Sequence, residues 1–119
     1  MNREKCPCCG FPTLEELNGY EICELCSWED DGQGDLNANE VLGGPNADYS
    51  LTEARKNFKE KLTMYRDYEQ KDDVIEAKKS LVNVFTELDK SEPGSVEYQA
   101  LWSKISFVEK ELEVIKYTE

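Results

Sequence analysis

The 119-residue sequence contains no histidine, and this absence removes several kinds of site. Without an imidazole the chain cannot form a mixed cysteine–histidine zinc finger, a histidine-containing catalytic zinc site, or a Cys–His or Ser–His nucleophile pair. The sequence also has no apolar run as long as the core of a signal peptide or a membrane span. We therefore expect a soluble, cytoplasmic protein that makes no membrane contact.

Basic residues are scarce in the first half of the chain. Residues 1–50 hold two of them (Arg3 and Lys5) against eleven acidic residues, a charge of −9. Residues 51–119 hold twelve against fifteen, a charge of −3, and the two halves sum to −12. Proteins that bind nucleic acid neutralise phosphates with basic patches, so we expect no nucleic-acid partner. The charge favours a basic protein as partner, and the alternative that acidity serves only solubility stays open.

Cysteine, in contrast, is concentrated at one end. All five cysteines lie within the first 26 residues, where they form two Cys-x-x-Cys pairs, the spacing of a four-thiolate zinc site. Pro7 and Gly10 suit a sharp turn in the first pair, because proline presets φ and glycine tolerates a positive φ. Ser27 stands at the matching place in the second pair, which predicts a less regular turn. The predicted ligands of one structural Zn²⁺ are Cys6, Cys9, Cys23 and Cys26.

Other interpretations of these thiols stay open. A disulfide framework conflicts with the odd number of cysteines and with the reducing cytosol. A thioredoxin-like redox pair lacks the βαβ pattern that normally surrounds it. An iron site of the rubredoxin type uses the same four thiolates and cannot be separated from zinc by sequence. We interpret Cys8, the odd thiol, as a small packed residue, with the alternative that it replaces Cys6 or Cys9 as a ligand.

Several segments together resemble the cysteine-rich CPCC family. They are Cys6-Pro7-Cys8-Cys9-Gly10, Gly19-Tyr20-Glu21-Ile22-Cys23, Cys26, Trp28-Glu29-Asp30-Asp31-Gly32-Gln33, Gly43-Gly44-Pro45-Asn46 and Ser50 to Phe58. The resemblance covers residues 6 to about 58, and it implies a zinc-binding module without supplying a catalytic activity. Residues 59–119 carry no pattern of that family.

The segment between the cysteine pairs predicts a β-hairpin. Asn18-Gly19 is a strong signal for a two-residue turn, and Leu14, Tyr20 and Ile22 suit short flanking strands. Residues 1–49 are therefore predicted to be a zinc-ribbon-like module, in which two knuckles face each other across a short hairpin. The module includes an acidic loop that starts at Trp28, with Trp28 folded back over the zinc knuckle. From Glu29 the loop only superficially follows a calcium-binding pattern, because its first and third ligand positions depart from that pattern.

Residues 50–119 show helical periodicity. Ser50 and Glu53 form a capping box for a helix that we expect to run to about residue 68, with Leu51, Ala54, Phe58, Leu62 and Tyr65 on one face. A second stripe runs from Val74 to Leu88, and Ser91-Glu92-Pro93-Gly94 ends it. A third helix opens near Ser95, with Trp102 and Phe107 off its main stripe, either on a wider buried face or on a contact surface. We expect three helices that pack on the cysteine module as one compact unit, an α+β fold.

Nothing in the sequence assembles an enzyme. No phosphate-binding glycine loop is present, and a closed four-thiolate site leaves no position for a reactive water. We expect a non-enzymatic, acidic interaction protein, such as an immunity or antitoxin protein that inhibits a basic, nuclease-like protein. The predicted contact surface is centred on Glu29, Asp30, Asp31 and Asp35. The alternatives are a zinc-stabilised regulatory or scaffold subunit and, third, an iron or redox protein; the sequence does not give the oligomeric state.

Overall fold

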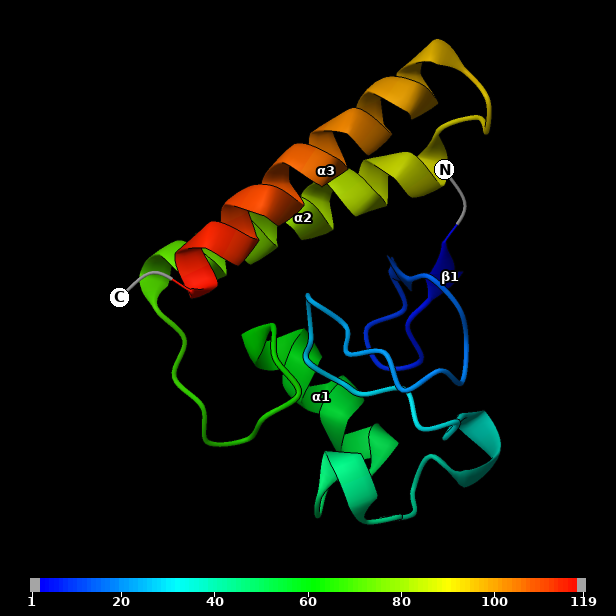
Figure 1. The fold of residues 1–119 in the computed structure, drawn as a ribbon, viewed down its shortest axis with the longest axis vertical. Coiled ribbons are helices and arrows are strands. Elements are labelled where there is room, and N and C mark those ends of the chain that lie inside the picture. The colour runs from blue at the N-terminus through cyan, green and yellow to red at the C-terminus, as the bar shows by residue number, and fades with distance from the viewer. Residues whose placement is uncertain (1–2, 118–119) are drawn as a thin grey trace. The chain divides into compact units, whose positions relative to one another are not determined.

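The computed structural model describes residues 3–117, whose contacts divide the chain into two compact units. The amino-terminal unit runs to Tyr68, and the carboxy-terminal unit begins at Glu69. The first contains all five cysteines and one α-helix, and the second contains two longer α-helices (Figure 1). No helix among the described residues is long and apolar enough to cross a membrane.

The amino-terminal unit opens with a very short antiparallel hairpin. Strand β1 (Glu4–Lys5) pairs with β2 (Pro12–Leu14), with Glu4 opposite Leu14 and Lys5 opposite Pro12. Two 3-10 helices, η1 (Asp35–Asn37) and η2 (Gly44–Asn46), interrupt the loops that follow, and α1 (Leu51–Lys61) comes after them. The predicted combination of a hairpin followed by three helices is confirmed. The hairpin, however, encloses the first cysteine pair.

The prediction of a hairpin turn at Asn18-Gly19 is wrong. Asn18 and Tyr20 both adopt left-handed backbone conformations, with φ values of 60° and 59°. Their amides bond to Asp30: the Asn18 N–H donates to the carboxylate (2.6 Å), and the Tyr20 N–H donates to the carbonyl oxygen (2.9 Å). Ile22 forms an isolated bridge with Glu29. The residues after the predicted turn therefore pair with the segment around Glu29 and Asp30, and the buried Asp30 carboxylate holds the Asn18 amide.

Helix α1 begins as the sequence predicts and ends early. The Glu53 N–H donates to the Ser50 side chain (3.0 Å), which confirms Ser50 as the N-cap. The helix ends at Lys61 because Leu62 turns left-handed (φ 62°) and its N–H donates to the Phe58 carbonyl (2.8 Å). Leu62 and Tyr65, which we placed on the continuing helical face, therefore lie beyond the helix.

Helix α1 packs with the cysteine-rich loops. The Arg55 side chain donates to the Pro7 carbonyl (2.9 Å), and the Phe58 ring meets the Phe11 ring edge-on, with centroids 6.3 Å apart. The division of the chain consequently falls after Tyr68, whereas the sequence suggested a boundary at 49/50. The apolar core of the amino-terminal unit consists chiefly of Leu14, Leu25, Trp28, Leu51, Ala54, Phe58 and Met64.

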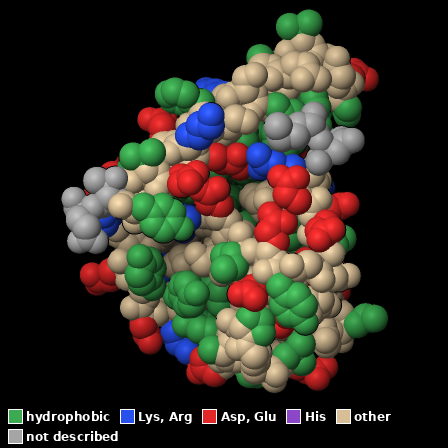
Figure 2. Space-filling view, in the orientation of Figure 1, with side chains coloured by type: hydrophobic (Ala, Val, Ile, Leu, Met, Phe, Trp, Pro, Cys, Tyr) green, Lys and Arg blue, Asp and Glu red, His purple; other side chains and the backbone are tan. Residues whose placement is uncertain are grey.

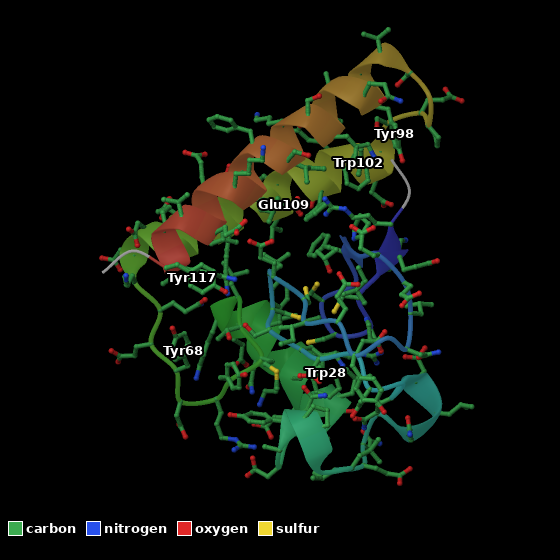
Figure 3. The ribbon with its side chains drawn as sticks, viewed as in Figure 1. Trp28, Tyr68, Tyr98, Trp102, Glu109 and Tyr117 are labelled. Atoms are coloured by element: carbon green, nitrogen blue, oxygen red, sulfur yellow. The ribbon has the colours of Figure 1, made fainter. Side chains whose placement is uncertain are left out.

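The carboxy-terminal unit is a pair of helices that lie side by side, α2 (Asp72–Lys90) and α3 (Val96–Lys116) (Figure 1). The break at 91–94 and the opening of a third helix near Ser95 are confirmed, and Ser95 is its N-cap. Trp102 is buried, with its ring 6.4 Å from both Phe85 and Tyr98 (Figure 3), so it belongs to a wide apolar face. Phe107 is exposed. The buried apolar residues of the pair are Val74, Leu81, Val84, Phe85, Leu88, Leu101, Trp102, Ile105, Val108 and Leu112.

Candidate metal centre

The two cysteine pairs lie in knuckles that share one backbone pattern. In the first, the Cys6 N–H donates to the Phe11 carbonyl (2.9 Å), and the Gly10 N–H donates to the Cys6 carbonyl (2.8 Å). In the second, the Cys23 N–H donates to the Trp28 carbonyl (2.9 Å), and the Ser27 N–H to the Cys23 carbonyl (2.8 Å). These bonds fold each knuckle back on itself, so that cysteines three positions apart can face the same point.

Both knuckles end in a left-handed residue. Gly10 has φ 80°, and Ser27 at the equivalent position has φ 75°. Glycine adopts this conformation without steric penalty, whereas a serine Cβ crowds the backbone there. The second knuckle is therefore as regular as the first, contrary to our expectation from Ser27, and the difference between them lies in backbone strain.

The knuckles bring the four predicted ligands together. The Sγ atoms of Cys6, Cys9, Cys23 and Cys26 all lie within 4.8 Å of one another. Between the knuckles, Cys6 Sγ is 3.6 Å from Cys26 Sγ, and Cys9 Sγ is 3.7 Å from Cys23 Sγ. A regular tetrahedron with metal–sulfur bonds of about 2.3 Å has sulfur–sulfur edges of about 3.8 Å. The four sulfurs, drawn in yellow in Figure 3 as all sulfur atoms are, thus fit a tetrahedral metal ion.

The thiols perturb one another strongly. Burial raises the pKa of Cys23, but hydrogen bonds from the other three thiols and from Thr13 outweigh it, so the pKa of Cys23 lies well below its ordinary value. Hydrogen bonding with Cys23 raises the pKa values of Cys6 and Cys9, and burial raises that of Cys26. Without a cation, one thiolate can form here at the expense of its neighbours. A divalent cation offsets that repulsion and allows four thiolates to coexist.

Thr13 is a site residue that the sequence analysis missed. It lies in β2, and its Oγ1 is 3.1 Å from Cys23 Sγ, where the hydroxyl donates once the thiol is ionised. Two backbone amides add to this support: the Cys26 N–H donates to Cys23 Sγ (3.5 Å), and the Trp28 N–H donates to Cys26 Sγ (3.5 Å). The spacing of the cysteines gives no hint of Thr13, which the β1–β2 hairpin places beside the second knuckle.

Cys8 and Trp28 lie where the sequence predicted them. Cys8 is buried and falls outside the group of four sulfurs. Trp28 is fully buried, and its backbone hydrogen bonds with Cys23 and Cys26 hold it against the second knuckle. Among residues 3–117, no acceptor lies within hydrogen-bond reach of its indole N–H.

The acidic loop is ordered by its own side chains. The buried carboxylate of Asp30 accepts from the amides of Asn18 and Gly32, and the buried Gln33 amide donates to the carbonyls of Asn37 (2.8 Å) and Glu40 (2.7 Å). Asp30 therefore cannot face a partner, which corrects its predicted place on the contact surface. In residues 3–117 the cysteine group alone gathers three or more metal-ligating side chains, so a calcium loop has no support.

Comparison with known proteins gives one match. A family model described as "Cysteine-rich CPCC" matches residues 4–79. The match includes both knuckles, the β1–β2 hairpin and α1, and it extends past the segment in which the sequence showed a resemblance. No curated protein and no solved structure matches the chain significantly.

Proposed function

This chain belongs to the cysteine-rich CPCC family, and we propose that its amino-terminal unit is a structural zinc module that serves protein–protein contact. The observation that carries the proposal is the cluster of four cysteine sulfurs, with knuckle-to-knuckle distances of 3.6 and 3.7 Å. Cys6, Cys9, Cys23 and Cys26 would hold one Zn²⁺. The ion would cross-link two loops that have little regular structure and would neutralise part of their thiolate charge.

Elemental analysis of freshly purified protein tests the metal. We expect one zinc per chain. Protein that contains iron and absorbs visible light would contradict zinc while leaving the ligands in place, and metal-free protein would contradict the whole proposal.

A matched pair of substitutions tests the ligands. Cys9→Ser removes a predicted ligand, whereas Cys8→Ser removes a buried thiol outside the four-sulfur group. We expect Cys8→Ser to keep one zinc and Cys9→Ser to lose most of it, because three thiolates bind Zn²⁺ more weakly than four. Equal loss from both variants would mean that the ligand assignment is mistaken.

The complete coordination shell of the proposed metal site supports a non-catalytic role. Four thiolates complete a tetrahedral coordination shell and leave no position for an activated water. Outside the cysteines, hydrogen bonding with Arg66 lowers the pKa of Glu53, and hydrogen bonding with Glu53 raises the pKa of Arg66. That pair is a salt bridge (2.7 Å) and gives no isolated acid or base for catalysis.

Contact with a basic protein is supported by charge and by exposed apolar residues. No lysine or arginine occurs between Lys5 and Arg55. In the loop at 15–22, Leu17, Tyr20 and Ile22 are at least half exposed among acidic residues. On the amino-terminal unit, green apolar side chains lie exposed between red acidic ones (Figure 2). Such a surface complements a cationic, partly apolar partner, which acidity would attract and apolar contact would retain.

Within this class we propose an immunity- or antitoxin-type inhibitor of a basic, nuclease-like protein, with a regulatory or scaffold subunit as the alternative. A reading frame for such a toxin immediately beside this gene would favour the first. Affinity capture with the full chain as bait, at low and at high salt, would identify the partner. Binding that weakens with ionic strength is expected, since screening removes the attraction between opposite charges.

Charge-neutralising variants then locate the contact. Glu15→Gln, Glu16→Gln and Asp31→Asn together should slow association with the captured partner and leave the zinc content intact. The control removes the same charge from exposed positions near the end of α2, with Glu87→Gln, Asp89→Asn and Glu92→Gln. If the control slows association equally, the surface is wrong. If Phe107→Ala alone weakens binding, the partner docks on α3.

A further inference from the structure

The two knuckles present their sulfurs differently. In the second knuckle, Cys23 Sγ accepts hydrogen bonds from Thr13 and from the Cys26 amide, and Cys26 Sγ accepts one from the Trp28 amide. Within residues 3–117, the Cys6 and Cys9 sulfurs hydrogen-bond only with other cysteine sulfurs. Hydrogen bonds delocalise thiolate charge, so the first-knuckle thiolates are the stronger nucleophiles.

Solvent access separates the two cysteines of the first knuckle. Cys6, Cys8, Cys23 and Cys26 are buried, whereas Cys9 is partly exposed. The next residue, Gly10, has no side chain, and a Cβ built on it would meet no atom within 4 Å. The space beside Gly10, which follows Cys9 in the chain, is therefore open.

A second thiolate lies within reach of Cys9. Its sulfur is 3.7 Å from that of Cys23 on the opposite knuckle. Sulfurs this close need to move by less than 2 Å to reach a disulfide bond length of about 2.05 Å. As a metal-bound thiolate, Cys9 would thus combine partial exposure, few hydrogen bonds and an adjacent thiolate.

We propose that Cys9 is a modification site at which a small hydroperoxide opens the metal centre, with Cys23 as the resolving thiol. This inference rests on the proposed metal site. The Cys9 thiolate attacks one peroxide oxygen, the O–O bond breaks, and Cys9 sulfenic acid forms with release of hydroxide. The Cys23 thiolate then attacks the Cys9 sulfur and expels a second hydroxide. With two protons the balance is two thiolates plus hydrogen peroxide giving one disulfide and two waters, each sulfur losing one electron.

The disulfide removes two of the four ligands. Cys6 and Cys26 then remain, and two thiolates are too few to retain the ion in a tetrahedral thiolate shell. Oxidation would consequently release the metal and loosen the module, which makes the contact surface sensitive to peroxide. Cys8, the buried thiol outside the four-sulfur group, is the competing thiol.

The test uses the full-length, zinc-loaded protein and hydrogen peroxide. A metallochromic chelator records zinc release, while alkylation, digestion and mass spectrometry identify which cysteines are oxidised. We expect about one zinc released per peroxide consumed, a Cys9–Cys23 disulfide, and Cys8 recovered as the alkylated thiol. A first disulfide that contains Cys8, or one that joins Cys6 to Cys26, would overturn the inference.

A variant that keeps the metal site intact distinguishes reaction at Cys9 from reaction at Cys8. Cys9→Ser is expected to bind zinc poorly, so Cys8→Ser serves as the control, and it should release zinc at the wild-type rate. Loss of peroxide sensitivity in Cys8→Ser would assign the reaction to Cys8 and overturn the inference. Protein that holds no metal before oxidation would overturn the metal site as well, whereas loaded protein that keeps its zinc under peroxide overturns this inference alone.

Discussion

The two units of this protein are stabilised in different ways. Within residues 3–117, the five non-glycine residues with positive φ (Asn18, Tyr20, Ser27, Ala47 and Leu62) all lie in the amino-terminal unit. Its strands have two and three residues and its single α-helix has 11, whereas the helices of the carboxy-terminal unit have 19 and 21. Strained, irregular backbone persists only where surrounding interactions hold it, so the amino-terminal unit needs strong local restraints.

Polar side chains supply part of those restraints. The buried Asn46 side chain bonds to both the amide (3.1 Å) and the carbonyl (2.8 Å) of Glu29, and the buried Asn57 amide donates to the Met64 carbonyl (2.8 Å). These bonds replace the ladder that a longer strand or helix would provide. The helical pair instead relies on apolar residues packed between two helices. The comparison teaches that the first unit combines its apolar core with polar bonds and a candidate metal site, whereas the second relies chiefly on apolar burial.

Of the changes considered, metal removal should produce the largest difference in stability between the two units. Ligation of a structural zinc contributes about 10–16 kcal/mol of apparent binding free energy, so chelation should unfold the amino-terminal unit. Helix α1 holds 11 of the 51 residues in the three α-helices. The helical circular dichroism signal should therefore fall by about a fifth. Fluorescence distinguishes the units, because each contains one buried tryptophan, Trp28 and Trp102.

Single-tryptophan variants give this experiment its control. In Trp102→Phe, the emission of Trp28 should shift to the red on chelation. In Trp28→Phe, the emission of Trp102 should stay unchanged. A Trp28 signal that survives complete metal removal would show that polar bonds and the apolar core suffice for the amino-terminal unit.

A complementary experiment introduces a substitution into the apolar core of the carboxy-terminal unit. Ile105 is fully buried in α3, so Ile105→Ala should lower the stability of that unit by about 2–5 kcal/mol through lost burial and a cavity. The zinc content and the Trp28 emission should not change. Thermal unfolding followed by helical signal measures the effect, and Ser103→Ala on the exposed face is the control. Loss of zinc from Ile105→Ala would mean that the two units depend on each other.

The sequence predicted the elements that simple patterns encode. Two Cys-x-x-Cys pairs were enough to identify the four sulfurs that come together, because ligand spacing reflects the turn that a knuckle requires. Ser50 was recognisable as an N-cap, since its side chain accepts from an amide only three residues away. Helical stripes located α2 and α3 well.

The errors came from long-range polar contacts. Asn18-Gly19 looks like a hairpin turn until the carboxylate of Asp30, twelve residues later, takes the Asn18 amide. Leu62 suits a helix, yet the chain turns there and Asn57 secures the exit through Met64. Thr13 reaches Cys23 only because the β1–β2 hairpin folds back. No local pattern contains these partners, so single-sequence reasoning could not place them.

Thr13 tests how far the polar restraints support the metal. Thr13→Val keeps the shape and the strand preference of the side chain but removes the hydroxyl from Cys23 Sγ, which lies 3.1 Å away. Loss of such a supporting hydrogen bond typically costs about 10- to 100-fold in metal affinity. Competition with a chelator of known affinity measures the change. Thr13→Ser keeps the hydroxyl and should bind zinc nearly as the wild type does. Equal affinities of the valine and serine variants would show that the hydroxyl is not needed.

The smallest expected effect concerns the strain of the second knuckle. Ser27 has φ 75°, its side chain makes no hydrogen bond recorded within residues 3–117, and Gly10 holds the matching position with φ 80°. Ser27→Gly should therefore stabilise the amino-terminal unit by up to about 1 kcal/mol, relief of strain exceeding the extra freedom of the unfolded chain. Gly10→Ala should destabilise it by a similar amount through φ alone, because a Cβ there meets no atom within 4 Å. Each variant is unfolded by adding increasing amounts of chelator while Trp28 emission is recorded. The shift of the unfolding midpoint relative to the wild type measures each change in stability. The two stability changes should have opposite signs, because the two knuckles have the same backbone conformation. A destabilising Ser27→Gly would show that the serine makes an interaction that outweighs its strain.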